Sequence, residues 1–180
     1  MIDSTKGFIM KLLIFLSILF SGNIFASSFH ELTIKTSTGE LMNFSTFKGK
    51  PVLLVNIATK CGYTPQLDDL EKLSKKYGEK LVVLGLPSND FGGQTPEGDA
   101  KVAEFCRLNY GVSFPLTTKI TVIGKDKHPV YKFLVGEGDE VNWNFEKFLV
   151  DKNGKIQARY KSSVKPMSEE LIGAIDKIVK

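Results

Sequence analysis

The sequence is poor in the side chains that most often bind metals: its 180 residues include two cysteines and two histidines. Cys61 and Cys106 lie far from each other and from His30 and His128, so none of them has the spacing of a zinc or iron site. We therefore predict no metal and no other bound cofactor. A long apolar run is also missing, because Leu12 to Phe20 is too short to span a bilayer comfortably. The sequence thus predicts no stable membrane anchor.

A dense basic segment is missing as well. The formal net charge is +4, and the lysines and arginines are spread along the chain rather than clustered. Because proteins that bind nucleic acid usually gather basic residues on one face, we predict no nucleic-acid partner. What remains is an ordinary globular composition, with 42% hydrophobic and 24% charged residues, in a chain long enough for one domain with its own core.

The first 26 residues have the pattern of an export signal. Lys6 and Lys11 supply positive charge, the apolar run follows, and Ala26-Ser27-Ser28 offers small residues for cleavage. We predict cleavage after Ala26, a folded domain at residues 27–180, and a location in the bacterial periplasm. The alternatives are a buried N-terminal strand or an uncleaved anchor; without a signal the protein would stay in the cytoplasm.

The pattern of apolar residues predicts an α/β domain. Leu32 to Phe44 alternates and turns as a β-hairpin, and Gln66 to Tyr77 has the spacing of a helix. Val52 to Ala58 and Leu81 to Leu86 are continuous apolar runs on either side of that helix. Two fully apolar strands joined by a helix indicate a parallel, right-handed crossover.

The second half of the chain predicts two helices, a second β-hairpin and a closing helix, at residues 95–110, 129–135, 145–160 and 168–178. Thr95-Pro96-Glu97 is typical of a helix start, with a capping hydroxyl and a proline in the first turn, and Ser168 is expected to cap the last helix. This order of elements is that of the thioredoxin-like fold, in which helices flank a central mixed β-sheet.

Cys61 stands where a thiolate can be stabilised. The apolar run Val52 to Ala58 ends just before it, Gly62 follows, and a helical pattern opens at Gln66. Unpaired N–H groups and the positive end of the helix dipole favour an anion at such a place, and Lys60 adds a cation. The alternative is an inert cysteine that behaves as a small hydrophobe.

Three segments resemble the glutathione peroxidase family, in the order that the family uses. They are the loop from Val55 to Thr64 around Cys61, the segment from Leu86 to Gln94, and the segment from Trp143 to Asp151. The likeness runs from about Phe44 to the C-terminus. Three motifs in order are specific, whereas any one alone is weak. The resemblance implies a thioredoxin-like fold and a thiol peroxidase activity that protects against oxidative stress.

The resemblance also implies roles for four side chains. Cys61 is the nucleophile that reduces hydrogen peroxide or organic hydroperoxides. Its hydrogen-bonding partners are Gln94, Trp143 and Asn144, whose amide and indole N–H groups suit a thiolate and a leaving oxygen that gains charge. Each partner also has a structural interpretation: Trp143 as a packing residue, Gln94 as a turn residue after two glycines, and Asn144 as a turn cap.

Cys106 has three interpretations. In the helix that ends at Tyr110 it could be an inert buried thiol, or it could form a permanent disulfide with Cys61 in an oxidising compartment. The resemblance implies a third role, in which Cys106 resolves the Cys61 sulfenic acid and a thioredoxin-like protein or glutathione reduces the disulfide. Because disulfide geometry allows only about 7 Å between Cα atoms, this role predicts local melting of the helix.

Two departures from the family bear on these roles. Ser88 stands where some members carry a further cysteine, and the segment from Gly124 to Gly138 lacks the long insertion that tetrameric members use to assemble. We therefore predict a monomer. Phe91, Tyr63 and Phe114 are predicted to form an apolar rim that admits either class of peroxide.

Two other functions stay open at this point. The first is an exported thiol–disulfide oxidoreductase on the same fold, although Thr64 occupies the position that would complete a Cys-x-x-Cys motif with Cys61. The second is a non-catalytic periplasmic binding protein with a structural disulfide.

Overall fold

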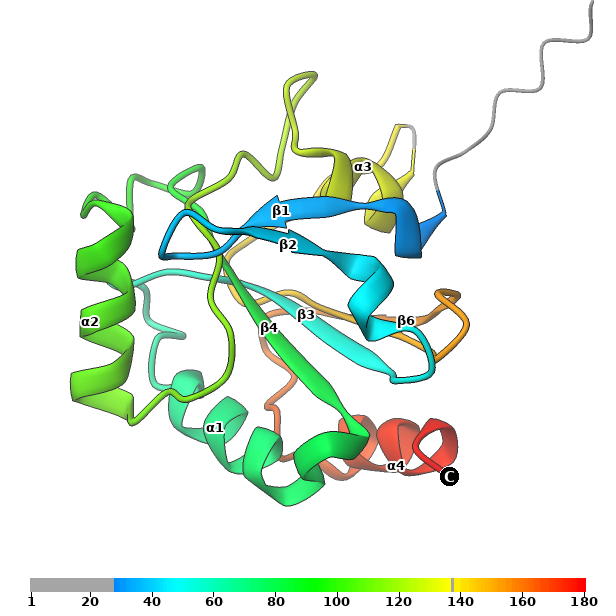
Figure 1. Ribbon diagram of the computed structural model, residues 1–180. Coiled ribbons are helices and arrows are strands. Elements are labelled where there is room, and N and C mark those ends of the chain that lie inside the picture. The colour runs from blue at the N-terminus through cyan, green and yellow to red at the C-terminus, as the bar shows by residue number, and fades with distance from the viewer. Residues whose placement is uncertain (1–27, 137) are drawn as a thin grey trace, which may run out of the picture.

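A computed structural model describes residues 28–136 and 138–180 of the chain (Figure 1). The predicted export signal, residues 1–26, lies outside the described residues, so the signal and the domain boundary after it stay predictions. Within the described ranges, none of the helices has the length and apolar character that a membrane crossing requires.

A four-stranded mixed sheet forms the centre of the domain. Its strands are, in spatial order, β4 (Val82–Pro87), β3 (Val52–Ile57), β5 (Lys147–Val150) and β6 (Ile156–Tyr160). β3 pairs with β4 in parallel, whereas β3 with β5 and β5 with β6 are antiparallel. All six residues of β3 are buried, as its continuous apolar run predicts. The architecture is the predicted thioredoxin-like fold.

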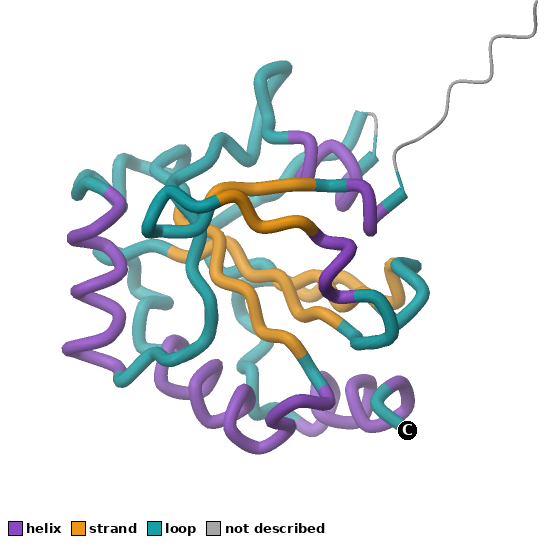
Figure 2. Tube along the Cα trace, viewed as in Figure 1, coloured by secondary structure: helices purple, strands orange, loops and turns teal. Residues whose placement is uncertain are grey.

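Two layers cover the sheet (Figure 1; Figure 2 shows the helices in purple and the strands in orange). On one face lie α1 (Gln66–Tyr77) and α4 (Glu169–Ile178), with α2 (Asp99–Tyr110) beside them. On the other face lie α3 (Pro129–Val135) and the hairpin of β1 (Thr33–Lys35) and β2 (Leu41–Asn43). Short 3-10 helices at Phe29–Glu31 and Phe44–Phe47 lie beside this hairpin. A third 3-10 helix, Gly78–Lys80, follows α1. Alternate side chains of β3 divide between the two layers, so Leu53 packs toward α1 and Leu54 toward the hairpin.

Most element boundaries match the sequence pattern. α1 and α3 have the predicted bounds, and Ser168 caps α4 by accepting the Leu171 N–H with its hydroxyl. Gly111 ends α2 in the left-handed conformation, at φ +64°, that favours glycine at a helix C-terminus.

The predicted start of α2 at Thr95-Pro96-Glu97 is wrong, because the helix begins at Asp99 after a Gly98 N-cap. The backbone of Thr95 is used elsewhere: its N–H donates to Asn89 Oδ1 at 2.8 Å, and its carbonyl accepts from Lys119 Nζ at 3.2 Å. These contacts keep Thr95 out of the helix, which begins at Asp99, whose Oδ1 accepts the Lys119 N–H at 2.7 Å.

The outer edge of β4 is covered by residues 115–117. The Gly85 N–H donates to the Pro115 carbonyl, and the Thr117 N–H donates to the Gly85 carbonyl, each at 3.0 Å. A Cβ atom on Gly85 would lie 2.5 Å from the end of the Leu116 side chain, so any larger residue there would force that side chain to move. Thr117 also pairs with Thr36, and this bridge joins the N-terminal hairpin to the sheet.

Candidate active site

Cys61 lies in the loop between β3 and α1, and 8% of its surface is exposed. Thr64 folds this loop back on itself, because its hydroxyl accepts the Cys61 N–H at 3.0 Å and donates to the Ala58 carbonyl at 2.9 Å. The Tyr63 N–H points at the sulfur, with 3.4 Å between nitrogen and Sγ. The Cys61 sulfur therefore has a backbone hydrogen-bond donor within the loop.

Lys60, the predicted cationic neighbour of Cys61, forms an ion pair with Glu97. Its exposed ammonium lies 3.1 Å from Glu97, which also accepts a hydrogen bond from the Thr59 hydroxyl at 2.7 Å. Burial raises the pKa of Glu97, but its hydrogen bonds and the Lys60 cation outweigh burial and hold that pKa below its usual range. Lys60 is thus paired, and the main effect of Glu97 is to tie the 94–97 loop to the end of β3.

Gln94 is held next to Cys61 by its backbone. Its carbonyl accepts the Lys60 N–H at 2.9 Å and the Thr59 hydroxyl at 3.2 Å. Its side-chain Oε1 accepts Asn144 Nδ2 at 3.0 Å. With Oε1 fixed in this way, the Gln94 Nε2 group is left without a hydrogen-bond partner among the described residues and is available as a donor.

The segment that carries Trp143 and Asn144 is held by Asn56 of β3. Asn56 Nδ2 donates to the Trp143 carbonyl at 3.0 Å, and its backbone carbonyl accepts the Phe145 N–H at 2.6 Å. Phe145 has φ +66°, a left-handed conformation that costs a bulky residue about 1–2 kcal/mol. For this reason β5 begins at Lys147 and not at Phe145, where the sequence predicted it.

The structure therefore gathers the predicted residues from three distant segments. The side chains of Gln94 and Asn144 are hydrogen-bonded to each other, and the Gln94 carbonyl is hydrogen-bonded to the Lys60 N–H next to Cys61. Trp143 packs on Phe91, with 5.5 Å between the ring centroids. Within the described ranges, the hydrogen bond to the Cys61 sulfur comes from Tyr63 and not from these three side chains. Their role as donors to the sulfur stays a prediction.

Cys106 is fully buried in α2, so its burial matches the predicted alternative of a buried thiol and is deeper than the half-buried position assumed for the resolving role. Its side chain faces the apolar cluster that α1 and α2 share, and burial raises the pKa of this thiol to about 12. Cys61 and Cys106 are both free thiols, so the structure contains no permanent disulfide between them. α2 fully buries two of its twelve residues, Val102 and Cys106.

The predicted apolar rim is partly different. Phe114 is 5% exposed and belongs to the core, where its ring packs against Gly85. Tyr63 and Trp143 are the exposed aromatic side chains of this region, at 37% and 40%, with Phe91 buried behind Trp143. Of the three residues of the predicted rim, Tyr63 is exposed, whereas Phe91 and Phe114 are buried.

Sequence reasoning missed Asn56 and Thr64. Asn56 carried a signal, because it is the one polar residue in the run from Val52 to Ala58 and a buried amide needs partners. Thr64 carried none, since a threonine before a helix is common and its bond to Cys61 follows from the shape of the loop.

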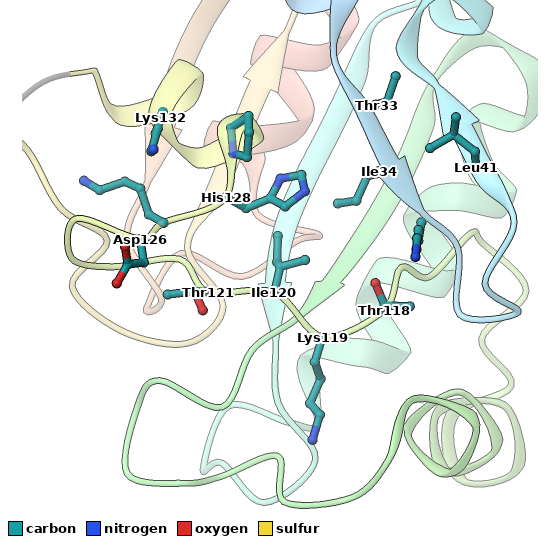
Figure 3. A pocket seen from close by; sticks show the side chains of 13 residues that line it. Thr33, Ile34, Leu41, Thr118, Lys119, Ile120, Thr121, Asp126, His128 and Lys132 are labelled. Atoms are coloured by element: carbon teal, nitrogen blue, oxygen red, sulfur yellow. The ribbon is translucent and has the colours of Figure 1, made fainter.

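A cavity of about 700 Å³ lies elsewhere, between β1 and the start of α3 (Figure 3). Thr33 and Ile34 line it on one side, and His128 and Lys132 line it on the other. None of the five predicted site residues borders this cavity. This cavity is therefore separate from the site around Cys61.

Comparison with known proteins decides the family. Residues 29–135 match the sequence profile described as "Glutathione peroxidase". The chain belongs to the glutathione peroxidase family. This confirms the resemblance that the three motifs indicate.

Alignments with named relatives cover most of the chain. The chain is 48% identical to "Glutathione peroxidase-like peroxiredoxin 2" of Saccharomyces cerevisiae over 79% of its own length and 92% of the yeast protein. It is 41% identical to "Hydroperoxy fatty acid reductase gpx1" of Synechocystis, over 74% of its length and 85% of that protein. It is also similar to the crystal structure of Trypanosoma cruzi GPX1, with a TM-score of 0.66, 28% identity, and coverage of 85% of this chain and 97% of that one.

Proposed function

We propose that this member of the glutathione peroxidase family is a thiol peroxidase that reduces hydrogen peroxide or organic hydroperoxides at Cys61. One observation carries the proposal. The Cys61 sulfur accepts a hydrogen bond from the Tyr63 N–H. Gln94 is hydrogen-bonded to the same loop through its backbone carbonyl, and Asn144 is hydrogen-bonded to the Gln94 side chain. A backbone donor to the sulfur and a second, unpartnered amide donor thus lie at one place on the surface.

The chemistry begins with attack of the Cys61 thiolate on one peroxide oxygen. An S–O bond forms, the O–O bond breaks, and its electron pair leaves with the other oxygen, which takes a proton to give water or an alcohol. The sulfur is oxidised to a sulfenic acid. The Gln94 Nε2 group and the Trp143 indole N–H are the donors for the oxygen on which charge develops, and Asn144 orients Gln94.

Exposed aromatic side chains near Cys61 favour a substrate that carries an apolar portion. Tyr63 and Trp143 leave exposed aromatic surface beside the Cys61 loop, and such surface suits an alkyl chain as well as it admits hydrogen peroxide. The name of the Synechocystis relative, a hydroperoxy fatty acid reductase, supports the same substrate class.

Resolution by Cys106 completes the proposed cycle. The Cys106 sulfur attacks the Cys61 sulfenic acid, the S–O bond breaks, water leaves, and a Cys61–Cys106 disulfide forms. The buried Cys106 must first leave the core, since its pKa of about 12 keeps it a thiol in the folded helix. α2 can unwind locally at a low cost in free energy, because only Val102 and Cys106 of its twelve residues are fully buried.

The electron donor, location and assembly complete the proposal. A thioredoxin-like protein reduces the disulfide, and the name of the yeast relative, a glutathione peroxidase-like peroxiredoxin, supports a thiol donor of this kind; glutathione is the alternative donor. Residues 1–26 direct export to the periplasm, where the domain acts as a monomer without a membrane anchor or nucleic-acid partner.

The experiment is a coupled assay that follows peroxide consumption with thioredoxin and, in turn, glutathione as the electron donor. We expect activity that is lost in Cys61→Ser, and a thioredoxin-dependent rate that falls strongly in Cys106→Ser. Unchanged peroxide consumption in Cys61→Ser would refute the proposal. Turnover of scrambled disulfides without peroxide would favour a thiol–disulfide oxidoreductase instead.

A further inference from the structure

The loop that leads into Trp143 is held by two charged side chains that the proposed chemistry does not use. Glu146 is 2% exposed, and its Oε1 accepts the Asn142 N–H at 2.7 Å. Its Oε2 accepts Arg159 Nε, also at 2.7 Å. A carboxylate this deeply buried persists only with strong partners, and a charged hydrogen bond to a guanidinium is one.

Arg159 extends this contact to earlier residues of the loop. Its Nη1 donates to the Asp139 carboxylate at 2.6 Å, and its Nη2 donates to the Glu140 carbonyl at 2.5 Å. The guanidinium also lies over the Phe148 ring, 5.2 Å from the centroid. Because a guanidinium is planar and its donors point in fixed directions, this one side chain of β6 holds Asp139 and Glu140 directly and reaches Asn142 through Glu146.

The same segment is held from its other end by Asn56, through the Trp143 carbonyl and the Phe145 N–H. Trp143 and Asn144 therefore lie between two attachments, one to β3 and one to β6. The left-handed backbone of Phe145 is unfavourable, so this conformation depends on the contacts around it.

We propose that Arg159 and Glu146 are positioning residues of the peroxidase site. By fixing residues 139–142, they hold the Trp143 indole and the Asn144 amide where these groups serve Cys61. The inference rests on the proposed roles of Trp143 and Asn144. Arg159 and Glu146 act only through the loop and contact neither the sulfur nor the peroxide.

The test uses the single tryptophan of the chain as its probe. Arg159→Met and Glu146→Gln should shift Trp143 emission to longer wavelength and increase its quenching by acrylamide. Both should also slow oxidation of Cys61 by hydrogen peroxide about tenfold or more, the expected effect of a misplaced donor. Arg159→Lys should be intermediate, since it keeps the charge but loses the forked geometry.

Arg107→Met is the matched control, because Arg107 is the only other arginine and is exposed on α2. It should leave the emission, the quenching and the Cys61 rate unchanged. Folded variants of Arg159 and Glu146 with wild-type emission and quenching would overturn the inference, whatever their rate.

Fluorescence also separates this inference from the proposed function. If the wild-type protein consumed no peroxide, the proposed function would fail, yet Trp143 emission would still show whether Arg159 holds the loop. If the variants changed the emission while Cys61 reacted at the wild-type rate, the loop contact would stand and the positioning role would be refuted.

Discussion

The Asn144 side-chain amide donates to the Gln94 side-chain carbonyl at 3.0 Å, although 50 positions separate the two residues. An amide whose oxygen is fixed in this way has a fixed N–H direction too. Asn144 therefore orients the Gln94 side chain, and the two side chains form one hydrogen-bonded unit rather than two independent donors.

Removal of either member of this unit should slow the first chemical step. We expect Asn144→Ala and Gln94→Ala each to reduce the rate of Cys61 oxidation by roughly a hundred- to a thousandfold, as loss of one oriented donor does. Stopped-flow measurement of sulfenic acid formation gives the rate. The double variant should be little slower than the slower single one, because coupled residues are not additive. Fully additive effects would contradict a shared role; Asn153→Ala, in an exposed turn, is the control.

Helix stability in α2 should control disulfide formation. Glu104 is exposed in the middle of α2, so Glu104→Gly and Glu104→Ala differ in helix propensity and little else. Glycine costs about 1 kcal/mol relative to alanine there, which makes the opened helix about fivefold more populated. The Cys61–Cys106 disulfide should form about fivefold faster in the glycine variant, as followed by quenched mass spectrometry after one equivalent of peroxide. Equal rates would show that α2 need not open.

Lys147 should give the protein an unusual alkaline stability profile. It is fully buried in β5, and its ammonium donates to Gln66 Oε1 at 2.6 Å and to the Ser162 and Val164 carbonyls at 3.3 and 2.5 Å. Burial lowers the pKa of Lys147 to about 8, against the opposing effect of Glu146. Between pH 8 and the unfolded pKa of about 10.4, the unfolded chain binds a proton that the folded protein has lost, so stability rises with pH.

Urea unfolding at several pH values measures this effect. From pH 8 to pH 10 the free energy of unfolding of the wild type should rise by roughly 2–3 kcal/mol relative to Lys147→Met, which cannot titrate. Lys147→Met should be less stable overall, because three buried acceptors lose their donor. A pH-independent difference between the two proteins would show that Lys147 keeps its proton.

The left-handed backbone of Phe145 should reverse the usual order of glycine and alanine. Both Phe145→Ala and Phe145→Gly lose a buried ring and should destabilise the protein by about 3–5 kcal/mol. The glycine variant should be the more stable of the two by about 1 kcal/mol, since glycine adopts φ +66° without strain. Phe148, buried in the regular strand β5, is the control position, where alanine should be the more stable replacement.

Much of the fold could be predicted because local patterns carry it. The apolar run of β3, the helical spacing of α1 and the capping Ser168 are each decided by residues that lie close together in the sequence. α2 was misplaced by three residues because the contacts that delay it come from Asn89 and Lys119, which a local pattern does not show.

The site could be predicted only in part, and for the same reason. Cys61, Gln94, Trp143 and Asn144 lie in motifs that can be recognised one by one, yet the bond between Gln94 and Asn144 is visible only in three dimensions. The left-handed Phe145 donates its N–H to the Asn56 carbonyl of β3, a distant contact of which a phenylalanine gives no local sign.

The two edge strands of the central sheet, β4 and β6, differ in how open they are to pairing with a second copy of the chain. Residues 115–117 already occupy the open backbone groups of β4 at Gly85, so that border cannot recruit a foreign strand there. β6 ends the sheet on the opposite side, and within the described ranges no strand pairs with its outer backbone. Should crowding or heat drive copies of this chain to pair through the central sheet, that sheet can grow at β6 but not at Gly85 of β4, and a proline at an outward-facing N–H of β6 would block this growth.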